Sequence, residues 1–147
     1  MVRKVQAWLV RGESGQALVE TAIVLPVLLV LAFGVVMAGR VVHAKIAVQA
    51  AAREAGRALA TAPSEEGGLT DADTAARSAA DGYGLSADGL SVALESNGFA
   101  RDGTVTATVS YDVGLGGLPF IGDLDVTVSS SHSENVEPYR SRELVHQ

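Results

Sequence analysis

The chain opens with a long apolar stretch that has no polar side. No charged side chain occurs from Thr21 to Gly39, which are 19 residues. As an α-helix they would span roughly 28 Å, close to the ~30 Å hydrocarbon core of a bilayer. A core helix of a soluble protein is disfavoured, because the rest of the chain is too small and too polar to surround it. The pattern predicts one transmembrane helix within residues 16–39.

The helical pattern continues beyond this span. Nine of the 19 residues from 44 to 62 are Ala, the strongest helix former. One narrow apolar stripe recurs at alternating spacings of three and four, and it comprises Val41, Ala44, Val48, Ala51, Ala55 and Ala58. Pro63 and the stretch 64–68 are expected to end the helix. Residues 40–62 are therefore predicted to extend the helix outside the bilayer.

Small residues on this extension permit close helix packing, as in the pairs Ala51/Ala55 and Ala52/Gly56. This face could pack against the chain's own domain or against neighbouring subunits. We expect both, and neighbouring subunits are favoured because the stripe is built from small residues rather than Leu.

The second half of the chain reads as a small α+β domain. Residues 70–81 form a short helix with acids in its first turn, and residues 90–95 and 103–113 form strands. A third strand starts at Leu124. The expected architecture is a membrane-anchored α+β chain: a long N-terminal helix, a short helix with one apolar face, and a three-stranded antiparallel meander. The face comprises Leu69, Ala72, Ala76, Ala79 and Tyr83.

Charge divides the chain more sharply than its net value of −6 suggests. Residues 1–15 and 16–62 each carry a small positive excess, whereas residues 63–147 carry four Arg against 14 acids. The acidic balance disfavours nucleic acid as a partner, since binding phosphates needs clustered Lys and Arg. The absence of Cys excludes disulfides and thiolate zinc sites. The tail from about Val136 has no pattern and is expected to be mobile.

No catalytic, metal or cofactor site is expected. The three histidines lie in a helix, at a strand end and in the tail. Asp71, Asp73 and Asp81 begin like a calcium loop but lack its glycine and its closing glutamate, so a solvated helix face is the better interpretation. An enzyme is therefore not predicted.

A basic leader precedes the span, and one carboxylate lies at the start of the apolar segment. Inserting the charged Glu20 side chain into the bilayer would cost about 2.5–3.5 kcal/mol at mid-bilayer and less near the membrane edge. It either reaches water at that edge or meets a specific cation. A cleavable secretory signal is disfavoured, because its apolar run is normally about 7–15 residues and basic residues follow here. Lys and Arg flank both ends of the span, so charge leaves the topology open.

A cut after Gly15 would make Gln16 the new amino terminus and Glu20 the fifth residue. The basic leader, Gly15, Glu20 and the apolar helix with Pro26 together resemble a type IV prepilin signal. The longer stretch from residue 15 to residue 55 resembles the TadE-like family of minor pilins, or pseudopilins, of the Tad (Flp) pilus system.

The resemblance implies that a membrane-embedded prepilin peptidase removes residues 1–15 on the cytoplasmic side. Residues 40–147 would then lie outside the cytoplasmic membrane as a single-pass protein. The implied partners are this peptidase, other Tad pilins and pseudopilins, the inner-membrane pilus assembly platform and the lipid bilayer. Glu20 would pair with an amino terminus during assembly.

Several alternatives stay open. The chain could be a major filament subunit, or an unprocessed membrane-anchored domain that binds a ligand. Pro26 either kinks the helix as a designed weak point or is merely tolerated in a membrane helix. Gln16 departs from the Phe or Met common in major pilins, and it could cyclise to a neutral pyroglutamate, which would remove the cation available to a carboxylate.

Overall fold

The computed structural model describes residues 3–97, 99, 103–116 and 124–136, with side chains from residue 15 onward. The chain divides into two compact units, Met1–Gly39 and Arg40–Gln147. These are the N-terminal and the C-terminal unit.

Helix α1 runs from Arg3 to Thr61 and ends within one residue of the predicted boundary. Pro26 lies inside it. Proline has no N–H and cannot donate to the carbonyl of Ala22, so α1 lacks one of its backbone hydrogen bonds at this point. Helix α1 also includes most of the leader, for which no secondary structure was predicted.

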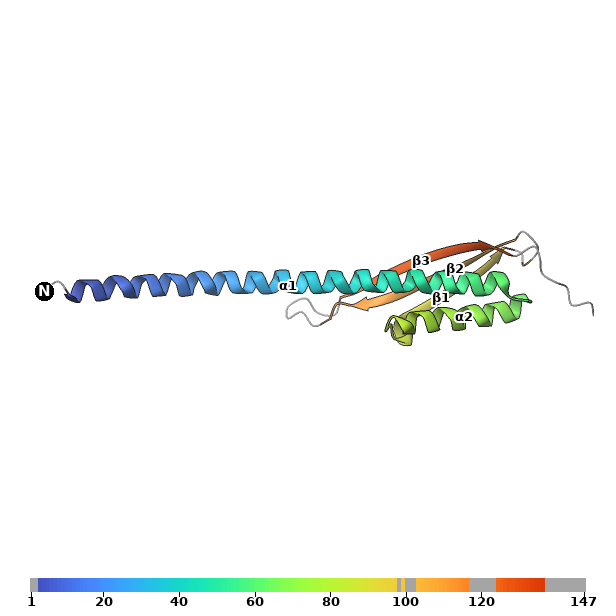
Figure 1. Ribbon diagram of the computed structural model, residues 1–147, viewed down its shortest axis with the longest axis horizontal. Helices are drawn as coiled ribbons and strands as arrows, with labels where there is room; N and C mark the ends of the chain where they lie inside the picture. The colour runs from blue at the N-terminus through green and yellow to red at the C-terminus, as the bar shows by residue number, and fades with distance from the viewer. Residues whose placement is uncertain (1–2, 98, 100–102, 117–123, 137–147) are drawn as a thin grey trace, which may run out of the picture. The chain divides into compact units, whose positions relative to one another are not determined.

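The C-terminal unit contains the predicted short helix and the antiparallel meander (Figure 1). After α1 come α2 (Glu65–Gly82), a 3-10 turn η1 (Ala87–Gly89), β1 (Leu90–Asn97), β2 (Thr104–Gly114) and β3 (Asp125–Asn135). The strand order is β1-β2-β3, with Leu90 opposite Tyr111 and Tyr111 opposite Val128. The predicted α+β fold class is confirmed.

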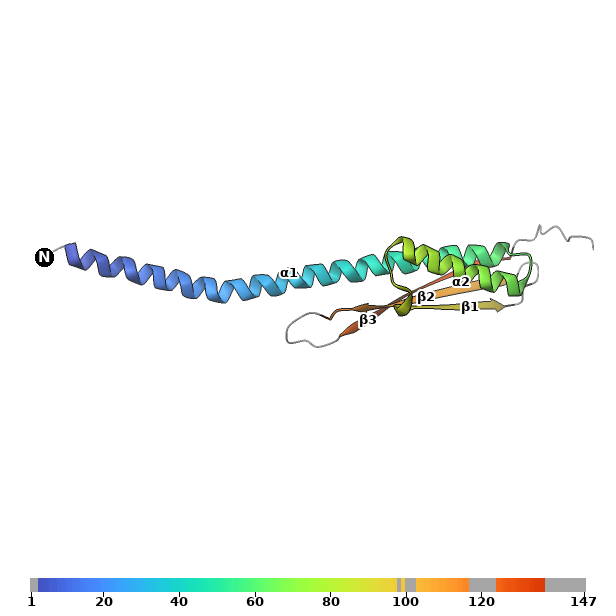
Figure 2. The same ribbon diagram turned by 90° about the horizontal axis from the view of Figure 1, so that it is seen from below.

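Alternation along the strands separates two faces of the sheet. The face that carries Val105, Ala107 and Val109 is buried, and α2 and the last part of α1 cover it (Figure 2). The opposite face carries a ladder of hydroxyl side chains, in which Thr106 and Ser133 hydrogen-bond across strands at 2.9 Å. The sheet is thus apolar on one side and hydroxyl-rich on the other, as its period of two requires.

The small residues of α1 pack inside their own unit. Ala51, Ala52 and Ala55 have no exposed surface, and a Cβ added to Gly56 would lie 3.1 Å from the His132 ring of β3. Of the two partners expected for these four residues, the structure therefore shows the chain's own domain. The prediction that neighbouring subunits are the favoured packing partners of these four residues is not supported, because all four are buried within their own unit.

The start of α2 corrects the predicted boundary. Helix α2 begins at Glu65, five residues before the predicted start at residue 70. The stretch 64–68 therefore starts the second helix and does not only end the first. Ser64 is the N-cap and accepts a hydrogen bond from the Gly67 N–H at 3.3 Å. A Cβ at Gly68 would lie 2.7 Å from the Ala62 Cβ. This glycine therefore permits close contact between two helices and does not mark a loop.

The expected apolar face of α2 is mostly confirmed. Ala72 and Ala76 are buried, and Ala80 is buried too. Tyr83 was expected on this face but is 42% exposed. It follows the last residue of α2 as the C-cap, so helical spacing no longer determines where its ring points.

β1 is longer than predicted, and the folded unit includes Val136. β1 continues to Asn97, and β3 begins at Asp125. Val136 is only 1% exposed and donates its N–H to the Gly103 carbonyl at 2.8 Å, so it belongs to the folded unit. Residues 137–147, on which the predicted mobile tail falls, lie outside the described residues.

Candidate membrane and processing segment

The predicted cleavage bond lies within a regular helix. Gly15 and Gln16 are both helical and exposed. A Cβ added to Gly15 would meet no atom within 4 Å. Nothing in the described part of the chain therefore requires glycine at this position for packing, and a role in recognition remains a prediction.

Glu20 lies beside an apolar groove on the surface of the same helix. The groove has a volume of about 240 Å³ and is lined by Glu20, Thr21, Val24, Leu25 and Leu28. The Thr21 hydroxyl donates to the Ala17 carbonyl at 2.9 Å, so its polar atom is satisfied within the helix. Among the described residues, Glu20 has no ion-pair partner.

The N-terminal unit exposes apolar side chains on all sides. Leu18 is 71% exposed and Ile23 is 66% exposed. The helical stretch Gly15–Thr61 contains a window that is long and apolar enough to cross a membrane, and no part of that window is buried. Exposed apolar surface costs about 25 cal/mol per Å² in water, so a bilayer or other apolar helices suit this segment far better than solvent.

Two polar contacts join the α1 segment of the C-terminal unit to the end of α2 and to β3. The His43 Nε2 lies 2.9 Å from the Tyr83 carbonyl at the end of α2. The Lys45 ammonium donates to the Ser129 carbonyl of β3. Lys45 thereby satisfies a backbone group on an edge strand, which is one way to protect such an edge. Sequence reasoning assigned neither contact, since both join residues far apart in the chain.

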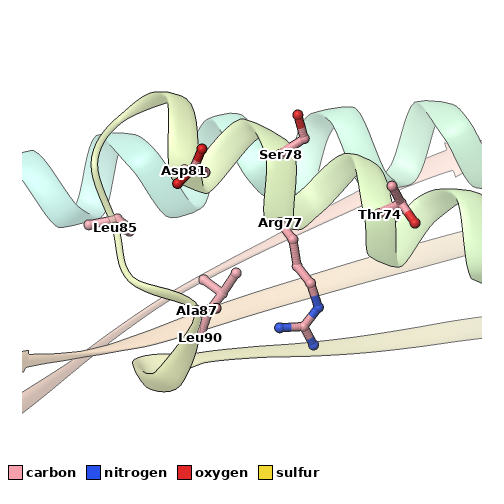
Figure 3. Close-up of a pocket in the computed structure, with 7 residues that line it drawn as sticks. All are labelled: Thr74, Arg77, Ser78, Asp81, Leu85, Ala87 and Leu90. Carbon is pink, nitrogen blue, oxygen red and sulfur yellow. The ribbon is translucent and has the colours of Figure 1, made fainter.

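A cavity of about 400 Å³ lies between α2, η1 and the start of β1 (Figure 3). Its lining comprises Thr74, Arg77, Ser78, Asp81, Leu85, Ala87 and Leu90. The Arg77 Nε donates to Asp73 at 2.8 Å, and this hydrogen bond and the adjacent charge raise the pKa of Arg77. Asp71, Asp73 and Asp81 all lie on the helix rather than in a loop. No group of three metal-ligating side chains occurs among the described residues.

Gly15 and Glu20 thus lie on a long, exposed apolar helix that continues into a small α+β unit. The family of TadE-like proteins matches residues 15–57 of the chain. This is the family that the stretch from residue 15 to residue 55 resembles, and the match suggests a pilin-like protein associated with the Tad pilus. No curated protein and no solved structure matches the chain.

Proposed function

We propose that this protein is a minor pilin, or pseudopilin, that is matured by a prepilin peptidase and takes part in assembly of a Tad (Flp) pilus. The observation that carries the proposal is where the family match falls. It begins at Gly15 and runs along α1 to Arg57. The match thus starts at the residue after which the peptidase would cut, and it leaves the basic leader outside.

In this proposal the chain is a single-pass protein of the cytoplasmic membrane. Residues 1–15 face the cytoplasm, residues 16–39 span the bilayer, and the C-terminal unit lies outside the cytoplasm. The bond between Gly15 and Gln16 lies inside a helix. Cleavage would therefore require local unwinding, which costs least near a helix end.

Glu20 would act after cleavage. The new terminal ammonium of one subunit and the Glu20 carboxylate of its neighbour would each be costly alone in a low-dielectric environment. As a pair they offset part of both desolvation costs. The apolar groove beside Glu20 offers space for a neighbouring apolar helix. The other implied partners are further Tad pilins and pseudopilins and the inner-membrane assembly platform.

The test replaces the glycine before the cut. We expect Gly15→Ala to block maturation in cells that contain the prepilin peptidase, as measured by the mass of the extracted chain. Gly39→Ala is the matched control, because a Cβ at either glycine meets no atom within 4 Å. Processing of Gly39→Ala should be normal. Normal cleavage of Gly15→Ala would contradict the proposed recognition and favour an unprocessed membrane-anchored binding domain.

A further inference from the structure

The four cations of α1 in the C-terminal unit lie apart from the acids of that unit. Residues 40–61 carry Arg40, Lys45, Arg53 and Arg57 against the single acid Glu54. The described residues from 62 to 136 carry ten acids and only one cation, Arg77. The α1 segment of this unit is therefore basic, and the remainder of the unit is acidic.

Two of these cations have no partner within the described part of the chain. Arg53 and Arg57 are exposed, and neither forms an ion pair or a side-chain hydrogen bond there. They continue an exposed stripe whose members are spaced three or four residues apart. We call this the α1 stripe, and it comprises Val42, Ile46, Gln49, Arg53 and Arg57. Val42 is 59% exposed and Ile46 is 49% exposed, so the stripe presents both apolar and cationic groups.

Helix α2 presents a stripe of opposite character. Asp71, Thr74, Ser78 and Asp81 recur at spacings of three and four, and all four are exposed. We call this the α2 stripe. Neither of its carboxylates is ion-paired in the described residues, since the ion pair on α2 joins Asp73 to Arg77. Its composition complements that of the α1 stripe in both charge and hydrogen bonding.

The two stripes also lie at corresponding heights, where height means position along the axis of α1. Helix α2 runs back beside α1, and the contact between His43 and the Tyr83 carbonyl aligns those residues. Counting back 12 residues from Tyr83 at equal rise brings Asp71 to about the height of residue 55, between Arg53 and Arg57. By the same count, Thr74 and Ser78 fall at about the heights of residues 52 and 48, on either side of Gln49.

We propose that the α1 stripe docks on the α2 stripe of a second copy of this chain, standing at the same height in the same membrane. Arg53 and Arg57 contact the neighbour's Asp71, and Gln49 meets the hydroxyls of Thr74 and Ser78. Two α1 helices packed in parallel register would instead bring like charges together, which disfavours that arrangement. This proposal rests on the proposed function only in that the copies share a membrane.

The contact is heterologous, because it joins different surfaces of the two copies. Each copy uses its α1 stripe on one side and its α2 stripe on the other, so one free stripe of each kind remains at the ends of any assembly. Such heterologous contacts form either closed rings or open filaments. Individual exposed ion pairs are weak, but common anchoring in a bilayer raises the effective concentration of the partners.

The absence of Cys in the chain allows a direct test by disulfide cross-linking. Full-length Gln49→Cys and Thr74→Cys chains with different tags are mixed in lipid vesicles and oxidised. We expect the mixed cross-linked dimer to exceed either same-variant dimer by about fivefold, and ~0.5 M salt to reduce it. Glu95→Lys, on the hydroxyl-rich sheet face, should leave the yield unchanged.

Charge exchange provides the decisive comparison. Arg53→Glu with Arg57→Glu in the Gln49→Cys chain should abolish the excess of mixed dimer, and Asp71→Lys in the Thr74→Cys chain should restore it. A predominance of Gln49–Gln49 dimers, or equal yields for all pairs, would overturn the proposal. Because the chains are tested uncleaved, this outcome does not depend on whether the peptidase acts at Gly15.

Discussion

At the scale of single residues, the most consequential side chain is the Glu20 carboxylate. It lies beside a groove lined by Leu25 and Leu28 and has no ion-pair partner in the described residues. The sequence identified it, because a lone acid at the start of an apolar segment requires an explanation. What the sequence could not supply is the groove, which depends on how neighbouring turns of α1 present their side chains.

We expect Glu20→Ala to be cleaved normally but to impair pilus assembly, because the new amino terminus of a neighbouring subunit loses its counter-charge. Glu54→Ala is the matched control, since Glu54 is also exposed on α1 but lies in the C-terminal unit. The measurement is the yield of surface pili together with the fraction of matured chain. Normal piliation of the Glu20→Ala strain would contradict the role given to this carboxylate.

Gly68 illustrates what the sequence could not reveal at this scale. Glycine usually breaks helices, and here it lies inside α2 because Ala62 leaves no room for a Cβ. Gly68→Ala should destabilise the protein by about 1–3 kcal/mol through overpacking, despite the better helix propensity of Ala. Gly82→Ala, where an added Cβ meets nothing within 4 Å, serves as the control in thermal unfolding. Equal stability of the two variants would argue against this tight contact.

At the scale of elements, periodicity predicted most of the architecture. The apolar run, the Ala-rich extension and the period of two in the strands each depend on local pattern, and α1, β1, β2 and β3 follow. The partner of the Ala-rich face could not be predicted, because small residues suit both intramolecular and intermolecular packing. The start of α2 was predicted too late, because the two glycines hid the capping signal of Ser64 followed by Glu65 and Glu66.

The N-cap of α2 gives an element-scale prediction. Ser64 accepts the Gly67 N–H, and Ser64→Ala should lower the free energy of unfolding by about 0.5–2 kcal/mol. Ser78→Ala provides a control, because Ser78 is exposed in the middle of the same helix. Unfolding monitored by circular dichroism should separate the two variants. A Ser78→Ala effect as large as that of Ser64→Ala would show that capping is not the cause.

At the scale of the whole molecule, the chain combines an apolar helix without a polar face and a C-terminal unit with separated charges. The first property suits a membrane, and the second suits contact with an oppositely charged surface. A major filament subunit remains an alternative to a minor pilin, and the abundance of the mature chain in purified pili distinguishes them.

The most direct test of the account is the intact mass and amino-terminal sequence of the membrane-extracted chain, with and without its prepilin peptidase. We predict a chain that begins at Gln16 only when the peptidase is present. The same mass reports whether Gln16 has lost ammonia by cyclisation, which would remove the cation proposed for Glu20. A chain that keeps its leader in the presence of the peptidase would contradict the pilin account.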